Sequence, residues 1–337
     1  MKLPWFDFSS WSIPRIAWIQ VEVTTRCNAA CVYCPHTAYR EVWQDRFLSL
    51  AVFRRLLPAF KKTRLVHLQG WGEPFLHPNF FSLAALARQA GCRVGTTTNG
   101  MVLDEAKLRQ VVGSGIDFIA FSLAGLGENH DRARPGTSFR KILECIQNLN
   151  RLKAAARCAT PQIHLAYLLL KSGQPDLEKL PRILPGLGVS QVVISTLDFV
   201  PSRELAGERL LIPDLPAYED LQARLAQVAA AAAHFGVAVD YHLDPPGARP
   251  LLCPEKAHQA FYVAADGAVS PCVFTNLPVS RVTYMGRDGE QPYQPLVFGN
   301  LLEQDLGAIW RRKAYTHFRR TFFTGHLATP CRQCLKL

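Results

Sequence analysis

The feature that most restricts the fold of this 337-residue chain is an alternation of strand-like and helix-like segments. Runs of apolar and β-branched residues predict strands at Trp18–Val23, Leu65–Gln69, Arg93–Thr97, Phe118–Leu123, Ile163–Leu169 and Gln191–Thr196. Apolar residues at helical period predict helices between them, at Leu50–Phe60, Asn79–Ala90, Asp104–Val112, Ser138–Ala156 and Pro175–Leu187. Such alternation builds a parallel sheet covered by helices, and barrels of this kind carry their chemistry at the carboxyl ends of the strands. The sequence therefore predicts an α/β fold with its functional site at that end of the sheet.

Three cysteines follow the first predicted strand directly. Cys27, Cys31 and Cys34 form a C-x3-C-x2-C pattern, whose thiolates can close on one metal cluster from a single loop. Three thiolates occupy three irons of a cubane and leave the fourth iron open for a small molecule. On these residues alone, two alternatives remain: a structural zinc ion with His36 as fourth ligand, or a disulfide with one spare thiol.

Short motifs follow the next three strands in order. They are Gly70-Trp71-Gly72-Glu73-Pro74, Thr98-Asn99-Gly100, and Ser122-Leu123-Ala124-Gly125 with His130-Asp131 and Arg134 downstream. Together with the cysteine loop, which has Tyr33 as its aromatic residue, this order resembles the radical S-adenosylmethionine (radical SAM) superfamily. The resemblance covers residues 17–199 and implies a partial (β/α)6 barrel.

The resemblance also implies a set of site residues. Cys27, Cys31 and Cys34 would ligate a 4Fe–4S cluster whose open iron binds S-adenosylmethionine, the source of a 5′-deoxyadenosyl radical. The implied cofactor-binding residues are Tyr33, Gly70, Gly72, Glu73, Pro74, Asn99, Ser122 and Arg134. Trp71 interrupts the usual glycine pair, and Ala124 stands where the family motif has an aspartate. No catalytic acid or base is therefore assigned.

A second cysteine set lies near the end of the chain. Cys253, Cys272, Cys331 and Cys334 form a C-x18-C…C-x2-C pattern. The segment Ala260–Val269, with its Asp-Gly turn, predicts a hairpin that brings the first two cysteines together. The terminal pair can then complete four ligands, for an iron–sulfur cluster or, as the alternative, for a zinc ribbon.

The residues between the two cysteine pairs carry a second resemblance. Phe298-Gly299-Asn300-Leu301 and Leu306–Trp310 resemble the corresponding segment of SPASM and twitch domains. This resemblance implies an auxiliary 4Fe–4S cluster with four protein ligands, in the shorter twitch form. The predicted domains are an N-terminal extension (1–16), the core barrel (17–200), a helical linker (201–247) and the auxiliary domain (248–337). Within the linker, Asp214 is expected to cap a helix, and Val237–Leu243 to add a strand.

Composition places the chain among cytoplasmic globular proteins. No apolar run reaches transmembrane length, and Met1–Ser12 lacks the apolar core of a signal peptide. Ten cysteines in a reducing compartment favour metal ligands over disulfides, whereas Cys92, Cys145 and Cys158 are expected to be core thiols. The net charge is +11, and the basic segment Ile309–Leu337 is expected to be a basic surface with core aromatic residues.

These observations favour a radical SAM oxidoreductase. An auxiliary cluster with four protein ligands has no open iron, but it can accept an electron from a substrate radical, which gives net two-electron oxidation. The expected partners are a small-molecule or peptide substrate and an electron donor such as flavodoxin or ferredoxin, with no membrane. Two alternatives stay open: a peptide-modifying maturase that forms a thioether, a carbon–carbon crosslink or an epimer, and a non-enzymatic iron–sulfur or zinc protein that binds nucleic acid.

Overall fold

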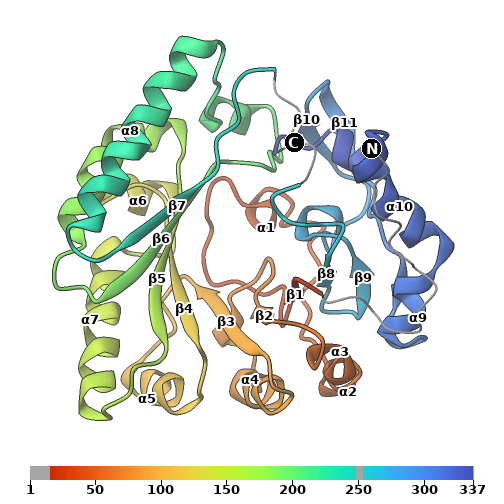
Figure 1. Cartoon of the computed structure of the whole chain (residues 1–337), viewed down its shortest axis with the longest axis horizontal. Helices are drawn as coiled ribbons and strands as arrows, with labels where there is room; N and C mark the ends of the chain where they lie inside the picture. Colours follow the sequence, from red (N-terminus) through yellow and green to blue (C-terminus); the bar gives the residue numbers. More distant parts are fainter. Residues whose placement is uncertain (1–15, 248–252, 337) are drawn as a thin grey trace, which may run out of the picture.

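The computed structural model describes residues 16–247 and 253–336. Within these ranges it contains a ten-stranded sheet in the order β12-β9-β8-β1-β2-β3-β4-β5-β6-β7. Figure 1 shows the sheet as an open arc with helices along its outer side. The central strands, all parallel, are β1 (Trp18–Val21), β2 (Leu65–Leu68), β3 (Arg93–Thr98), β4 (Phe118–Leu123), β5 (Gln162–Leu168) and β6 (Val189–Ser195). The prediction of a partial barrel is confirmed.

The strands separate an apolar outer face from a polar inner face. Ile19 and Val66 are fully buried and belong to the main hydrophobic core. Side chains alternate along a strand, so Gln20, Glu22 and His67 point to the opposite, inner face. Burial of apolar side chains on the outer face stabilises the fold. The inner face can therefore carry the polar side chains of a functional site.

Three of the five helices predicted between the strands are present as predicted: α4 (Phe80–Gln89), α5 (Glu105–Gly113) and α7 (Phe139–Ala155). Helix α6 (Glu128–Ala133) was not predicted. Asp104 and Ser138 cap α5 and α7, because their side chains accept from the backbone N–H groups of Lys107 and Lys141.

Two helix predictions were wrong in form, and proline accounts for both. The segment Leu50–Phe60 is split into α2 (Leu50–Arg54) and α3 (Leu57–Phe60), since Pro58 has no N–H to continue the first helix. The segment predicted at Pro175–Leu187 is a 3-10 helix, η2 (Lys171–Ile183), with Pro175 and Pro181 inside it. Prolines at these spacings remove N–H donors that an α-helix would need.

The segment predicted as a helical linker extends the sheet. Helix α8 (Leu215–Ala233) is capped by Asp214, whose side chain accepts from the N–H of Ala217 at 2.9 Å. Strand β7 (Ala238–Tyr241) pairs in parallel with β6, which confirms the predicted additional strand. A short 3-10 helix, η3 (Glu204–Glu208), precedes α8.

The C-terminal residues continue the same sheet on its other side. Strands β8 (Ala260–Val263) and β9 (Ala268–Ser270) form the predicted hairpin, and β8 pairs in parallel with β1. The remaining elements are η4 (Val273–Thr275), β10 (Thr283–Gly286), β11 (Gly289–Pro292), β12 (Gly299–Asn300), α9 (Leu306–Arg311), α10 (Lys313–Thr324) and α11 (Thr329–Arg332). The N-terminal extension lies outside the described residues except for Ile16.

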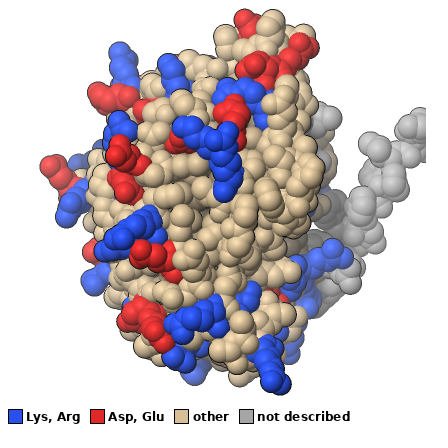
Figure 2. Space-filling model, turned by 90° about the vertical axis from the view of Figure 1, so that its left-hand side faces the viewer, with Lys and Arg blue, Asp and Glu red and all other residues tan. Residues whose placement is uncertain are grey.

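The C-terminal helices agree in part with the expectation of core aromatic residues. Tyr315 and Phe318 of α10 are buried, as expected for core aromatic residues, whereas Phe323 is 69% exposed. Figure 2 shows basic and acidic side chains interspersed on the face formed by α7 and α8. In the described part of the chain, no helix is both long enough and apolar enough to span a bilayer.

Candidate cofactor sites

The first cysteine set lies in the loop between β1 and α1 (Pro35–Ala38). Cys31 is buried, and Cys27 and Cys34 are partly buried. Two backbone hydrogen bonds hold the loop against the end of α6 (Glu128–Ala133) and the residues that follow it: Val32 donates to Ala133 at 3.0 Å and Ala30 to Pro135 at 2.7 Å. All three thiols are free and are presented at the carboxyl end of β1.

The surroundings of these thiols disfavour bare thiolates. Burial raises the pKa of Cys27 to about 11 and that of Cys34 to about 12. Glu73 raises the pKa of Cys27 further, and Cys31 that of Cys34. Cys27 and Cys34 therefore stay protonated near neutral pH until a metal displaces their protons, as happens at cluster ligands.

Glu73 and Asn99 connect the loops after β2 and β3 to this cysteine loop. The Oε2 atom of Glu73 accepts from the backbone N–H of Asn99 at 2.7 Å, and its Oε1 accepts from the hydroxyl of Thr98 at 2.7 Å. The Asn99 amide donates to Oδ1 of Asn28 at 2.9 Å and lies 4.0 Å from Sγ of Cys27. Burial raises the pKa of Glu73, and these N–H and hydroxyl donors offset part of that rise. The structure therefore brings three of the predicted site residues together.

Arg134 lies under the same loop. Its side chain is buried, and its guanidinium donates to the hydroxyl of Tyr33. Its Nε is buried and has no hydrogen-bond partner among the described residues. A buried cation with an unused donor fits an anionic ligand such as the carboxylate of S-adenosylmethionine.

The remaining predicted residues occupy the same end of the barrel. Ser122 is partly buried at the end of β4, and Pro74 is buried at the start of η1 (Pro74–Leu76). Gly70 and Gly72 allow their loop to approach β1, because a Cβ would lie 2.3 Å from Cγ of Glu22 and 2.4 Å from the carbonyl oxygen of Arg26, respectively. The close approach that the structure shows is thus to the protein itself, and contact of these glycines with the cofactor stays a prediction.

His130 has a positioning role that the motif alone did not reveal. Its Nδ1 accepts from the N–H of Ala124, and its Nε2 lies 3.0 Å from the hydroxyl of Thr137. Burial lowers the pKa of His130 to about 3, and nearby Arg134 adds to this effect, so the ring is neutral. Its hydrogen bonds hold the loop that carries Arg134 against the end of β4. A histidine that lies a few residues from possible hydrogen-bond partners on both sides is the signal in the sequence that could have indicated this role.

The zinc alternative for the first set finds no support in the position of His36. Its ring packs edge-on against Trp43 with centroids 5.2 Å apart. Across 16–247 and 253–336, no group of three or more His, Cys, Asp and Glu side chains is arranged around a single-ion site. Thiolates around a cubane stand further apart than thiolates around one ion, because iron and sulfide atoms lie between them.

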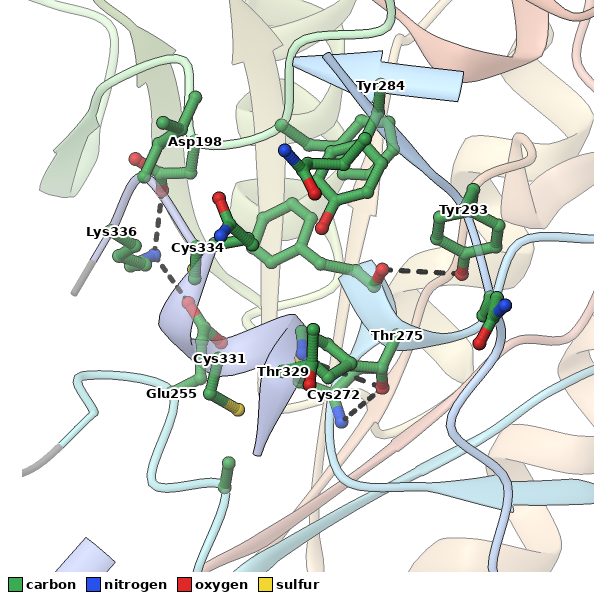
Figure 3. Close-up of a pocket in the computed structure, with 18 of the residues that line it drawn as sticks. Asp198, Glu255, Cys272, Thr275, Tyr284, Tyr293, Thr329, Cys331, Cys334 and Lys336 are labelled. Carbon is green, nitrogen blue, oxygen red and sulfur yellow. Dashed lines mark hydrogen bonds and ion pairs between the residues drawn. The ribbon is translucent and has the colours of Figure 1, made fainter. Parts of the chain in front are cut away.

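The second cysteine set lines a common cavity of about 310 Å³ (Figure 3). Its walls include Cys253, Cys272, Cys331 and Cys334, all free thiols. Burial raises the pKa of Cys272 and of Cys334, the latter to about 11, so these thiols too stay protonated until a metal binds. The four thiols fit a cluster that is ligated entirely by cysteine.

Two features of this cavity were not visible in the sequence. Lys336 donates to Asp198 at 3.1 Å and to Glu255 at 2.5 Å, and so ties the C-terminal segment to the end of the barrel (Figure 3). Phe199 stacks on Tyr284 with ring centroids 5.3 Å apart, forming an aromatic wall. The cavity therefore lies between the barrel and the auxiliary cysteines.

Two family models match the chain. The radical SAM superfamily model matches residues 21–158, and the SPASM iron–sulfur cluster-binding domain matches residues 253–335. The chain belongs to the radical SAM superfamily and has a C-terminal SPASM domain. As a radical SAM enzyme of this type, it uses a 4Fe–4S cluster with S-adenosylmethionine, and an auxiliary iron–sulfur cluster.

Relatives cover most of the chain at low identity. The tungsten-containing aldehyde ferredoxin oxidoreductase cofactor-modifying protein of Pyrococcus furiosus is 25% identical over 94% of this chain and 86% of its own length. The PqqA peptide cyclase of Gluconobacter oxydans is 25% identical over 93% of this chain and 81% of its own. The structure of SuiB from Streptococcus suis bound to S-adenosylmethionine has a TM-score of 0.65 at 14% identity, covering 91% of this chain and 68% of SuiB. This last likeness confirms the fold.

Proposed function

We propose that this radical SAM enzyme is an oxidoreductase that removes a hydrogen atom from its substrate and passes one electron to the auxiliary cluster. Cys27, Cys31 and Cys34 would hold the first cluster at the carboxyl end of β1. When bound, this cluster supplies the electron that splits S-adenosylmethionine into methionine and the 5′-deoxyadenosyl radical. The substrate loses two electrons in total, one with the hydrogen atom and one to the auxiliary cluster.

The chain's own residues would bind and orient S-adenosylmethionine. The buried guanidinium of Arg134 would pair with its carboxylate through the unpartnered Nε. Glu73, Asn99 and Ser122 lie at the ends of neighbouring strands, where polar groups can reach the rest of the cofactor. Burial of these groups would exclude water from the reactive radical. The other residues proposed at this site are Tyr33, Gly70, Gly72 and Pro74.

The observation that carries the proposal is the position of the second cysteine set. Its four thiols share one cavity with Asp198 and Phe199, which follow β6 at the carboxyl end of the barrel. An auxiliary cluster on Cys253, Cys272, Cys331 and Cys334 would thus face the region where the substrate radical forms. With four cysteine ligands it is suited to electron transfer rather than to direct substrate binding.

The test is product stoichiometry with anaerobically reconstituted protein. We expect one 5′-deoxyadenosine per two-electron-oxidised product, and deuterium transfer from labelled substrate into 5′-deoxyadenosine. Cys272→Ala should still cleave S-adenosylmethionine but should lose the oxidised product, whereas Cys158→Ala, which changes a thiol outside both sets, should behave as wild type. A product of unchanged oxidation state would contradict the proposal.

Peptide modification is a second candidate that the relatives favour. One matched relative is a PqqA peptide cyclase, and SuiB has been solved with a bound precursor peptide. The substrate would then be a peptide, and the auxiliary cluster could serve oxidative crosslinking. Saturable binding of a candidate precursor peptide, with a mass change in that peptide on turnover, would support this function.

For either function we propose a flavodoxin or ferredoxin as the electron donor and a cytoplasmic location.

A further inference from the structure

Glu22 is a buried carboxylate at the junction of the two domains, and no motif described above includes it. It follows β1 and precedes the cysteine loop, and it is 1% exposed. Its backbone N–H donates to the carbonyl of Val263, at the end of β8, at 2.8 Å. Glu22 therefore lies where the barrel and the SPASM domain share the sheet.

The two carboxylate oxygens of Glu22 accept from loops of different domains. Its Oε1 accepts from the backbone N–H of Trp71 at 3.0 Å, in the loop proposed to bind S-adenosylmethionine. Its Oε2 accepts from the N–H of Ala265 at 3.2 Å, in the turn between β8 and β9. One side chain therefore holds both loops, each through a different carboxyl oxygen.

The loop after β2 is shaped to reach this carboxylate. A Cβ added at Gly70 would lie 2.3 Å from Cγ and 2.6 Å from Oε1 of Glu22. Both distances are too short for any side chain, and the carboxylate cannot retreat without losing its two N–H donors. The glycine at position 70 is therefore required for the contact between Glu22 and the next residue, Trp71.

Trp71 continues the connection toward the auxiliary cysteines. Its indole N–H donates to the carbonyl of Asn276 at 3.3 Å, and the Asn276 amide donates to the hydroxyl of Ser270 in β9 at 3.1 Å. Its ring packs edge-on against Phe274 with centroids 6.1 Å apart. Phe274 belongs to η4, which Cys272 caps. The tryptophan that departs from the family motif thus joins the proposed cofactor loop to the segment that carries an auxiliary ligand.

We propose that Glu22 and Trp71 are positioning residues that couple the two cofactor sites, so that the auxiliary cluster strengthens binding of S-adenosylmethionine. This inference rests on the proposed function, because it takes the loop at 70–74 as part of the S-adenosylmethionine site and Cys272 as a cluster ligand. A cluster that orders the Cys272 segment also orders Asn276 and the β8–β9 turn. These groups hold Trp71 and Glu22, and through them the loop. By thermodynamic linkage the effect is reciprocal.

Glu22→Gln tests the coupling with little change in shape. Glutamine has one amide oxygen in place of two carboxylate oxygens, so it can hold only one of the two loops in the same geometry. We expect anaerobically reconstituted E22Q to bind S-adenosylmethionine about tenfold more weakly by calorimetry. Hydrogen exchange in the cluster-free protein should become faster in both 70–73 and 264–266, which lie far apart in the sequence.

A double-mutant cycle separates coupling from simple destabilisation. Cys272→Ala should weaken S-adenosylmethionine binding about tenfold in the wild-type background and not at all in E22Q, because the connection is already broken there. Trp71→Phe keeps the backbone N–H to Glu22 and loses only the indole donor, so it should show a smaller effect of the same kind and serves if E22Q fails to fold.

Trp310→Phe is the matched control. This buried indole of the SPASM domain stacks under the guanidinium of Arg319 at 3.6 Å and belongs to α9. It should lower stability and leave S-adenosylmethionine affinity unchanged. Unchanged affinity in folded E22Q, or additive effects of E22Q and Cys272→Ala, would overturn the coupling while leaving the proposed function intact. Failure of wild-type protein to bind S-adenosylmethionine would instead remove the proposed function.

Discussion

Arg134 illustrates how a single buried side chain can indicate the chemistry of the ligand that a site binds. Its guanidinium is held by Tyr33 on one side, and its Nε is left without a partner among the described residues. Leaving a buried charged donor unsatisfied is costly, so such a group is expected to serve a ligand.

Replacing Arg134 should weaken cofactor binding far more than it changes stability. We expect Arg134→Met to lower S-adenosylmethionine affinity tenfold to a hundredfold, on the order of the ~1.5–3 kcal/mol of a charge-assisted hydrogen bond. Arg134→Lys should recover part of this loss, since it keeps the charge but not the planar donors. Isothermal titration calorimetry measures the change. Arg132→Met, at an exposed position two residues earlier, is the control, and an equal loss in that variant would refute the assignment.

Glu22 should also make stability depend on pH. Burial raises its pKa from 4.5 to about 7, and the N–H groups of Trp71 and Ala265 offset only part of that rise. Asp266, which is paired with Arg46, adds to the rise, and Tyr262 faces the carboxylate from β8. Between these two pKa values the folded state holds a proton that the unfolded state has lost.

The contribution of Glu22 to the free energy of unfolding is therefore fully present below about pH 4.5 and lost as the pH rises to about 7. The expected loss is about 3 kcal/mol across this window. Glu22→Gln cannot titrate, so the free energy of unfolding of this variant should fall less between pH 5 and pH 8. Urea unfolding of both cluster-free proteins at these two pH values, about 5 and about 8, provides the comparison. Parallel pH profiles for the two proteins would show that the carboxyl does not titrate in this range.

Among the elements, helix α8 is expected to contribute to the stability of the fold and not to either cofactor site. It is capped by Asp214 and packs on the sheet through Leu221, Leu225 and Val228, all of which are buried. None of the residues that line the cavity of the auxiliary cysteines belongs to it. A change at its first turn should thus affect folding alone.

Asp214→Ala should lower the free energy of unfolding by about 1 kcal/mol, because the N–H of Ala217 loses its side-chain acceptor. Asp214→Asn keeps an acceptor oxygen and should cost less. Chemical denaturation measures the stability of each variant, and calorimetry with S-adenosylmethionine should show no change in affinity. A loss of affinity in Asp214→Ala would mean that α8 also positions the cofactor site.

For the whole molecule, the decisive feature is that both domains share one sheet. Strand β8 pairs with β1, and Lys336 near the C-terminus pairs with Asp198 beyond β6. The C-terminal part of the chain is therefore attached to the barrel both at β1 and just beyond β6. The geometry of the auxiliary cysteines depends on contacts between segments that are distant in sequence.

Lys336→Met should remove the two ion pairs that hold the C-terminal segment and leave the partly buried carboxylates of Asp198 and Glu255 without their cation. Because Cys331 and Cys334 belong to that segment, we expect iron content to fall from about eight to about four atoms per chain, with the first cluster retained. Lys336→Arg should keep both clusters. Iron and acid-labile sulfide assays, with electron paramagnetic resonance of the reduced protein, report on this directly. Full iron content in folded Lys336→Met would show that the ion pairs are dispensable for cluster assembly.

The amino-acid sequence alone was sufficient for the barrel, both cysteine sets and most of the proposed S-adenosylmethionine residues. These features are local: strand and helix periods span a few residues, and Cys27, Glu73, Asn99 and Ser122 each lie at or just beyond the end of a strand. In a parallel sheet such ends meet at the same edge, so order along the chain predicts proximity in space.

Only the tertiary structure revealed the contacts that join the domains. Ala265 lies 243 residues from Glu22, and no periodicity or motif links them. The same holds for Lys336 with Asp198, and for the pairing of β8 with β1. Such contacts depend on which surfaces the folded chain brings together. The residues next to a buried carboxylate or lysine in the sequence do not indicate which distant residue it will contact.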